Sequence, residues 1–119
     1  MKYLFILNDP PYGTELSFNA LRLIQALLKT EPKPELSVFL MADAVACAKI
    51  GQITPNGYYN LEHMVRSVAR QAPVVLCGTC MDARGISDAD IVEGAQRGTM
   101  PQLAEMTAAA KCWCFRRRS

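Results

Sequence analysis

Two cysteines separated by two residues lie in the segment LCGTCMDARGI, which runs from Leu76 to Ile86. The apolar run VVLC ends at the first of them, Cys77, and predicts a short buried strand. In open parallel sheets, ligands and reacting groups collect at the carboxyl ends of the strands. Cys77 and Cys80 are therefore the first candidates for chemistry in this chain.

The neighbours of the two thiols bear on their acidity. A helical turn over Met81 to Arg84 would direct free N–H groups toward the sulfurs and favour thiolate over thiol. Arg84 would add a positive charge nearby, and Asp82 would oppose it. The residues alone therefore leave the direction of the net pKa shift open.

Four interpretations of the cysteine pair remain at this point. The thiols can be small core hydrophobes, zinc ligands, a thioredoxin-like dithiol, or a nucleophile that carries sulfur as a persulfide. Zinc would also need the sulfurs of CWC, but that segment is typical of an apolar strand, so we expect Cys112 and Cys114, like Cys47, in the core. We therefore expect no metal. The last two interpretations stay open, because both need an exposed thiolate of low pKa.

The loop NDPPYG supplies three further polar candidates. Asn8, Asp9 and Tyr12 follow the first predicted strand, so they would lie at the same edge of the sheet as Cys77 and could line a shared pocket. Arg84 is the fourth candidate for that pocket. The loop has neither the GxGxxG nor the P-loop spacing, and we expect no nucleotide or other cofactor.

Length and charge narrow the class of protein. A chain of 119 residues fits one domain over 1–119. The net charge is +2, and without the basic tail Arg116–Arg118 the charges nearly cancel. We therefore expect neither a nucleic-acid partner nor a membrane partner. No signal peptide or apolar run of about 18 residues is visible, which predicts a cytoplasmic protein with reduced thiols.

Strand and helix patterns alternate along the chain. Apolar runs predict strands over 2–7, 36–41, 74–77 and 112–115, with a weaker one at Ile91 and Val92. Helices are predicted over 15–29, 43–49, 61–72 and 100–110, with caps at Asp43, Asn60 and Thr99. This alternation is typical of a parallel sheet with helices on both faces. The first helix has only one narrow polar stripe, so we expect it to be covered from more than the sheet side, which indicates a subunit interface.

Five segments carry a resemblance to a known family: PYGTE, VFLMADAV, GYYN, LCGTCMDARGI and GTMPQLAE. In these segments the chain resembles the DsrE/DsrF-like family, and most closely its small YchN-type members. The resemblance implies a three-layer α/β/α fold with a five-stranded parallel sheet, and a homo-oligomer that is a trimer or a hexamer of two trimers. It also implies that Cys77 aligns with the cysteine on which the relay members carry sulfur, whereas Cys80 belongs to the YchN-type subset.

The leading functional hypothesis is therefore a sulfur carrier or sulfurtransferase that holds a persulfide on Cys77. Its partners would be proteins that donate and accept sulfur. Cys80 would be a second thiol able to attack that persulfide and release sulfide. Two alternatives stay open: an oligomeric module that binds a small ligand without catalysis, and a thiol–disulfide redox protein that uses the CxxC pair. Whether the chain is an enzyme is not decided by the sequence.

Overall fold

Five parallel strands form one sheet in the computed structural model, which describes residues 1–116. The strands are β1 (Lys2–Leu7), β2 (Glu35–Leu40), β3 (Val74–Cys77), β4 (Ala95–Gly98) and β5 (Lys111–Phe115). Their order across the sheet is β4-β3-β2-β1-β5, and every pairing is parallel. The carboxyl ends of all five strands therefore lie along one edge, as expected.

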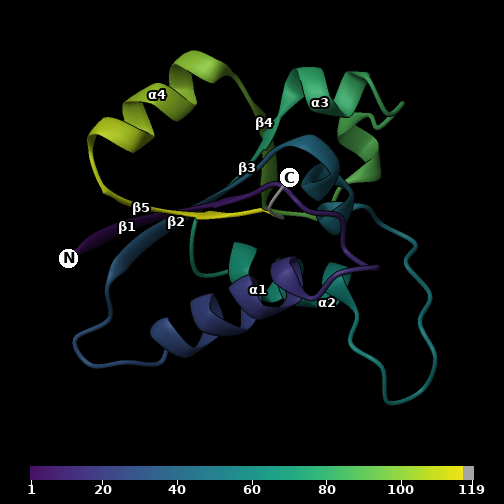
Figure 1. The fold of residues 1–119 in the computed structure, drawn as a ribbon, viewed down its shortest axis with the longest axis horizontal. Helices are drawn as coiled ribbons and strands as arrows, with labels where there is room; N and C mark the ends of the chain where they lie inside the picture. The colour runs from purple at the N-terminus through teal and green to yellow at the C-terminus, as the bar shows by residue number, and fades with distance from the viewer. Residues whose placement is uncertain (117–119) are drawn as a thin grey trace.

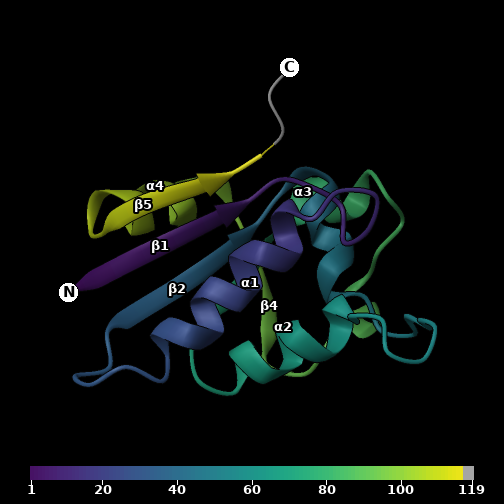
Figure 2. The same ribbon diagram turned by 60° about the horizontal axis from the view of Figure 1, so that its bottom comes forward.

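Helices cover both faces of this sheet (Figure 1). On one face lie α1 (Leu16–Leu27) and α2 (Leu61–Ala69), and on the other lie α3 (Gly78–Asp82) and α4 (Met100–Ala108). Two 3₁₀ helices, η1 (Ala42–Ala48) and η2 (Asp88–Asp90), follow β2 and α3. Figure 2 shows the same layers turned, with α1 and α2 in front of the sheet. The predicted three-layer α/β/α fold is confirmed.

Two hydrophobic cores, one on each face, explain the continuous apolar runs of the inner strands. The larger core, under α1 and α2, includes Phe5, Val38 and Leu76. The smaller core, under α4, consists of Leu4, Phe39, Val75, Cys77 and Leu103. Neighbouring residues of one strand point to opposite faces, so β1, β2 and β3 must be apolar on both.

Helix α2 of the same chain covers most of the apolar surface of α1 that the sheet leaves free. Leu21, Ile24 and Leu28 are buried, and α1 packs against α2 as well as against the sheet. Leu16 and Leu27 are half-buried, and Leu23 alone of these leucines remains strongly exposed, at 45%. Because α2 covers most of the apolar surface of α1, this helix alone does not require a subunit interface.

The predicted helix caps are confirmed at two of three positions. The Asn60 side chain accepts a hydrogen bond from the His63 N–H at 3.2 Å, and the Thr99 hydroxyl accepts one from Gln102 at 3.3 Å. The prediction for Asp43 is wrong. Met41 occupies the cap position of η1 without a side-chain bond, because the Asp43 carboxylate pairs with Arg84 instead.

The two outer strands differ from expectation. Ile91 and Val92 are buried, but they are not the fourth strand; Ile91 forms an isolated antiparallel bridge with Lys49, and the strand comes later, in the polar segment AQRG. The predicted last strand is present, but the prediction that Cys112 and Cys114 are buried is wrong. Both are exposed, because β5 lies at the edge of the sheet beyond β1.

Arg116 is exposed, while the rest of the basic tail, Arg117 and Arg118, lies outside the described residues. Within residues 1–116, none of the helices has the length and apolar character needed to cross a bilayer.

Candidate functional site at the cysteine pair

The strand-to-helix junction after β3 positions the two thiols. Cys77 is the last residue of β3 and also the cap residue of α3, which begins at Gly78. The helical turn thus starts three residues before the predicted Met81, and it contains Cys80. A Cβ at position 78 would lie 2.8 Å from Arg97 Nη1 and 3.2 Å from the Gly98 carbonyl oxygen. Glycine therefore lets the start of α3 lie close to the end of β4.

The Cys77 sulfur accepts several hydrogen bonds. The Thr79 hydroxyl lies 3.2 Å from Cys77 Sγ, and once the sulfur is a thiolate only the hydroxyl can donate. Burial raises the pKa of Cys77, but hydrogen bonds from the side chains and backbone N–H groups of Thr79 and Cys80 outweigh it, so the pKa lies below its ordinary value. Cys77 is 5% exposed and is reached through a pocket.

Cys80 has the opposite tendency. Burial and the hydrogen bond to Cys77 raise the pKa of Cys80, while the N–H of Ala42 and the charge of Arg84 oppose the rise. The Ala42 N–H donates to Cys80 Sγ at 3.2 Å. Ala42 has a φ of 52°, a left-handed conformation that costs a non-glycine residue about 1–2 kcal/mol. The pair thus consists of one thiol that favours ionisation and one that keeps its proton.

The two sulfurs are close enough to react after a small adjustment. Residues three apart on a helix have Cβ atoms about 5–6 Å apart, and a disulfide needs about 3.5–4.5 Å. Cys77 and Cys80 have this spacing across the first turn of α3. A disulfide between them therefore requires local movement of the turn and no larger rearrangement.

A pocket of about 270 Å³ opens onto Cys77 between α3 and the start of α4. We call it the cysteine pocket; its lining residues are Cys77, Gly78, Thr79, Asp82, Arg97, Gly98, Thr99 and Met100. The Arg97 guanidinium is held by Asp88 at 2.9 Å, by Asp82 at 3.0 Å and by the Gly78 carbonyl at 3.1 Å. Two carboxylates already bind this cation, so it offers little to an anionic ligand.

The other predicted pocket residues point elsewhere along the same edge. Asn8 Nδ2 donates to Cys114 Sγ at 3.7 Å, on the β5 side. Asp9 is buried at the start of α1, where its carboxylate accepts from Thr14. Tyr12 donates to Gln52 at 2.6 Å and accepts from the Leu61 N–H. None of the three lines the cysteine pocket.

Arg84 also lies outside the lining of this pocket, but it contacts Cys80. Its Nη1 donates to the Cys80 carbonyl at 3.0 Å, and its Nη2 donates to Asp43 at 2.8 Å. It therefore links the backbone of Cys80 to Asp43 of η1.

The remaining cysteines are not part of this site. Cys47 is fully buried, and burial raises its pKa to about 12. Cys112 and Cys114 lie on β5, with β1 and β2 between them and β3. Among residues 1–116, no three His, Cys, Asp or Glu side chains come close enough together to hold a metal ion.

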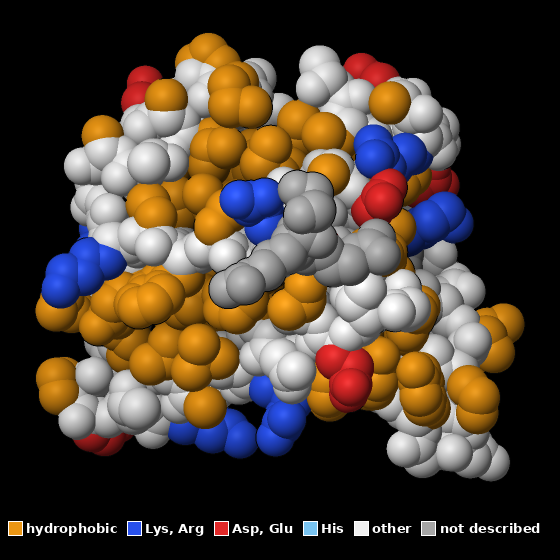
Figure 3. Space-filling model, in the orientation of Figure 1, with side chains coloured by type: hydrophobic (Ala, Val, Ile, Leu, Met, Phe, Trp, Pro, Cys, Tyr) orange, Lys and Arg blue, Asp and Glu red, His pale blue; other side chains and the backbone are white. Residues whose placement is uncertain are grey.

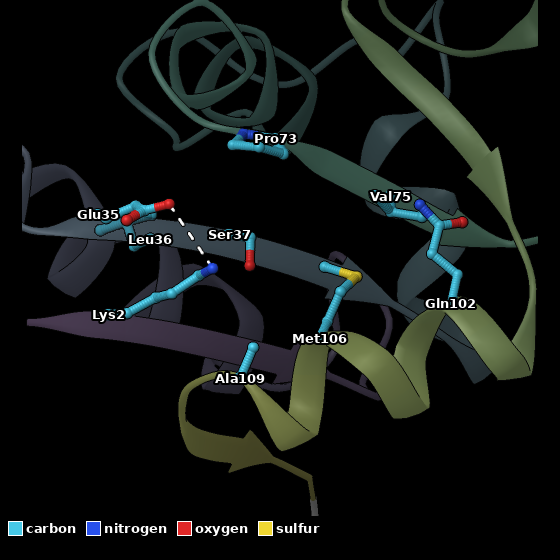
Figure 4. Close-up of a pocket in the computed structure, with 9 residues that line it drawn as sticks. All are labelled: Lys2, Glu35, Leu36, Ser37, Pro73, Val75, Gln102, Met106 and Ala109. Atoms are coloured by element: carbon cyan, nitrogen blue, oxygen red, sulfur yellow. Dashed lines mark ion pairs between the residues drawn. The ribbon is translucent and has the colours of Figure 1, made fainter.

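A second cavity, of about 260 Å³, lies at the opposite end of the strands (Figure 4). Lys2 and Glu35 form an ion pair of 3.7 Å beside it, and Ser37 points into it between β1 and α4. Its other lining residues are Leu36, Pro73, Val75, Gln102, Met106 and Ala109. It contains no thiol and no pair of groups suited to acid–base chemistry, and its volume lies just below the range of roughly 300–1,000 Å³ that is usual for small-molecule sites.

Three contributors to the site were missed from the sequence. Thr79 stands inside CGTC, so its proximity to Cys77 could have been inferred. Ala42 follows the second strand and so stands at the correct edge, but only its backbone takes part. Arg97 lies in a strand that the sequence did not reveal.

We expect Cys77 to be the first thiol to react with a limiting amount of an alkylating reagent. Only the thiolate reacts, so the lowered pKa of Cys77 shifts the midpoint of its rate–pH curve below that of an ordinary thiol, and the raised pKa of Cys80 shifts its midpoint above. Peptide mapping at several pH values checks this. The exposed Cys112 and Cys114 serve as an internal reference for access, and preferential labelling of Cys80, Cys47 or Cys112 would contradict the assignment.

The fold and the site together define a class: a three-layer α/β/α protein with a cysteine pair at the carboxyl end of a central parallel strand. The DsrE/DsrF-like family matches residues 1–111, and the chain belongs to this family.

Individual relatives agree with this assignment. The chain is 42% identical to protein YchN of Escherichia coli (strain K12) over 110 residues, which cover 92% of this chain and 93% of the relative. It is 36% identical to the uncharacterized protein MJ0989 of Methanocaldococcus jannaschii over 104 residues, covering 87% and 89%.

Solved structures agree as well. The crystal structure of the E. coli ychN protein superposes with a TM-score of 0.88 at 41% identity, covering 97% of this chain and 99% of that one. The protein MTH1491 of Methanobacterium thermoautotrophicum, at 14% identity and a TM-score of 0.67 over 95% and 96% of the two chains, shares the fold.

Proposed function

We propose that this protein carries sulfur as a persulfide on Cys77. The observation that supports this most directly is the set of donors around the Cys77 sulfur, which lowers its pKa despite burial. In the proposed step the Cys77 thiolate attacks the outer sulfur of a donor persulfide. The sulfur–sulfur bond of the donor breaks, the donor leaves as a thiolate, and the transferred sulfur keeps its proton on Cys77.

The cysteine pocket favours a particular kind of donor. An oxyanion such as thiosulfate finds no uncommitted cation among the residues that line the pocket, because Arg97 is bound by Asp82 and Asp88. A persulfide on the cysteine of a partner protein needs no such cation. Sulfur-donating and sulfur-accepting proteins are therefore the proposed partners.

Intact-protein mass spectrometry after incubation with a small persulfide donor tests the proposal. We expect the wild-type protein to gain the mass of one sulfur atom, and peptide mapping to place it on Cys77. A protein that gains no sulfur under conditions in which a free thiol does so would exclude the carrier role.

The cysteine pair also supports a second candidate, a thiol–disulfide redox protein. The opposite pKa shifts of Cys77 and Cys80 would give one attacking and one resolving thiol. The Cys80→Ser variant separates the two functions: a sulfur carrier still takes up sulfur on Cys77 and keeps it, whereas a redox protein needs both thiols and no longer forms the internal disulfide on reaction with a disulfide.

We also propose that the chain assembles as a trimer or a hexamer through the edge of the sheet at β5. Trp113, 53% exposed, and Leu23 line an apolar cavity of about 200 Å³ together with Tyr3, Phe5 and Leu27. Figure 3 shows hydrophobic side chains gathered on the surface between α4 and α1. An exposed apolar patch along an unpaired strand is characteristic of an interface.

Light scattering at micromolar concentration tests the assembly. We expect a mass of several times 13.1 kDa for the wild type, and a smaller mass for Trp113→Asp, because a charge would be buried in an apolar interface. Ile53→Asp, at an equally apolar but 96% exposed position in the loop before α2, is the matched control. A wild-type mass near 13.1 kDa would exclude the oligomer.

A further inference from the structure

Ala42 has a backbone conformation that its side chain does not favour. No other non-glycine residue among the described ones has a positive φ. Ala42 lies between Met41, which is extended, and the body of η1, and its amide faces α3 rather than its own helix. Residues held in sparsely populated conformations cluster at functional sites when the surrounding structure fixes them there. The conformation therefore makes the Ala42 amide a candidate functional group.

The amide donates to the sulfur of Cys80, with an N–Sγ distance of 3.2 Å. A thiol sulfur is a weak acceptor, whereas a thiolate accepts a charge-assisted bond of about twice the strength of a neutral one. The contact therefore contributes little while Cys80 is protonated and much more once it has lost its proton. A resolving cysteine requires this behaviour, because it is protonated before the reaction and attacks as a thiolate.

A single arginine side chain connects the segment of Ala42 to the peptide that carries Cys80. Arg84 binds Asp43 Oδ1 through Nε at 3.1 Å and through Nη2 at 2.8 Å. Its Nη1 donates to the Cys80 carbonyl at 3.0 Å. Asp43 is the residue directly after Ala42, so the ion pair holds the start of η1 against α3 at the point where the amide meets the sulfur.

The charged and titratable groups that face Cys80 are few. Cys77 faces it from the end of β3 and Arg84 from just after α3, and Arg84 is in turn paired with Asp43 of η1. Asp82, on the same helix, is engaged with Arg97 in the cysteine pocket. Removing the charge of Asp43 therefore changes the electrostatics at Cys80 in a known direction, since one negative charge is lost.

We propose that Asp43 and Arg84 are positioning residues that hold the Ala42 amide on Cys80, so that the Cys80 thiolate is stabilised when this thiol acts as the resolving group. The resolving role rests on the proposed function, but the positioning does not. In the resolving step Cys80 first loses its proton to solvent, and the resulting thiolate attacks Cys77 Sγ of the persulfide. A bond forms between the two cysteine sulfurs, the bond to the outer sulfur breaks, and the outer sulfur leaves as hydrosulfide.

The Asp43→Asn variant tests the positioning, because two explanations predict opposite signs. If Asp43 acted only through its charge, its removal would favour the Cys80 thiolate and lower the pH midpoint of Cys80 alkylation. If Asp43 positions the Ala42 amide, its removal weakens the bond to the thiolate and raises the midpoint. A hydrogen bond to a charged group is about twice as strong as a neutral one, so we expect its weakening to lower the alkylation rate below the midpoint by roughly tenfold.

The measurement uses the full chain with Cys77→Ser as the background, iodoacetamide as the probe, and peptide mapping to follow Cys80. Glu35→Gln is the matched control, since it removes an exposed carboxylate from the Lys2 ion pair at the far end of the strands. Circular dichroism establishes that each variant is folded. A raised midpoint in Asp43→Asn alone supports the proposal. A midpoint that is unchanged or lowered, or that rises equally in Glu35→Gln, overturns it. No sulfur donor is needed, so this result is independent of the persulfide hypothesis.

Discussion

Replacing Cys77 with serine is expected to abolish the sulfur adduct that a persulfide donor leaves on the protein. The serine hydroxyl keeps nearly the same shape and can still bond to Thr79, but it remains un-ionised at neutral pH and does not attack a sulfane sulfur. The loss should be complete within the detection limit of intact-protein mass spectrometry.

Two comparisons make this result specific. Cys112→Ser removes an exposed thiol on β5, which two strands separate from β3, and it should leave the adduct intact. Thr79→Val keeps the thiol but removes the hydroxyl 3.2 Å from it, so it should slow adduct formation without preventing it. A Cys77→Ser protein that still accumulates sulfur would show that another thiol is the carrier.

Replacing Cys80 with serine is expected to lengthen the life of the adduct on Cys77, by roughly tenfold or more. The reason is proximity: a neighbouring thiol reacts as if it were present at a very high effective concentration, so its loss leaves only slow external reactions. The measurement is the decay of the adduct after the donor has been removed, together with the sulfide that is released. In the wild type the product should be a disulfide between Cys77 and Cys80, which an external thiol then reduces.

The alternative for Cys80 is a purely structural role, since its side chain packs against both hydrophobic cores. In that case Cys80→Ser would lower the melting temperature and leave adduct decay unchanged. Following both quantities on one sample separates the cases. Decay equal to that of the wild type would return Cys80 to a packing residue.

The inner part of the fold could be predicted because its physical requirements leave a strong pattern. Strands β1, β2 and β3 are covered on both faces and are therefore continuous apolar runs. Asn60 and Thr99 could be assigned as caps because few side chains can satisfy the free N–H groups at the start of a helix.

The outer part could not be predicted in the same way. Strand β4 lies at the edge and exposes Gln96 and Arg97, so its sequence resembles a loop. Ile91 and Val92 are buried in the larger core beside η1, so they form an apolar run that resembles a strand in the sequence. The apolar β5 resembles a central strand, but its position beyond β1 depends on the order of the strands, which residue patterns do not encode.

The candidate site shows a similar division. The cysteine spacing and the apolar run before it were sufficient to place Cys77 at a strand end. These features did not predict the direction of the pKa shift of Cys77. That direction results from hydrogen bonds of Thr79 and Cys80, which depend on where α3 begins. The Ala42 amide left no signature at all, because any residue type carries a backbone N–H.

The pairing of β1 with β5 joins two strands that are far apart in the sequence. Tyr3 to Leu7 lie in register with Lys111 to Phe115, and all the other strands and helices lie between them along the chain. During synthesis on the ribosome, β1 can pair with β2 early, but its other side remains open until β5 has emerged. A truncated product that lacks β5 would therefore expose the edge of β1 to other nascent chains.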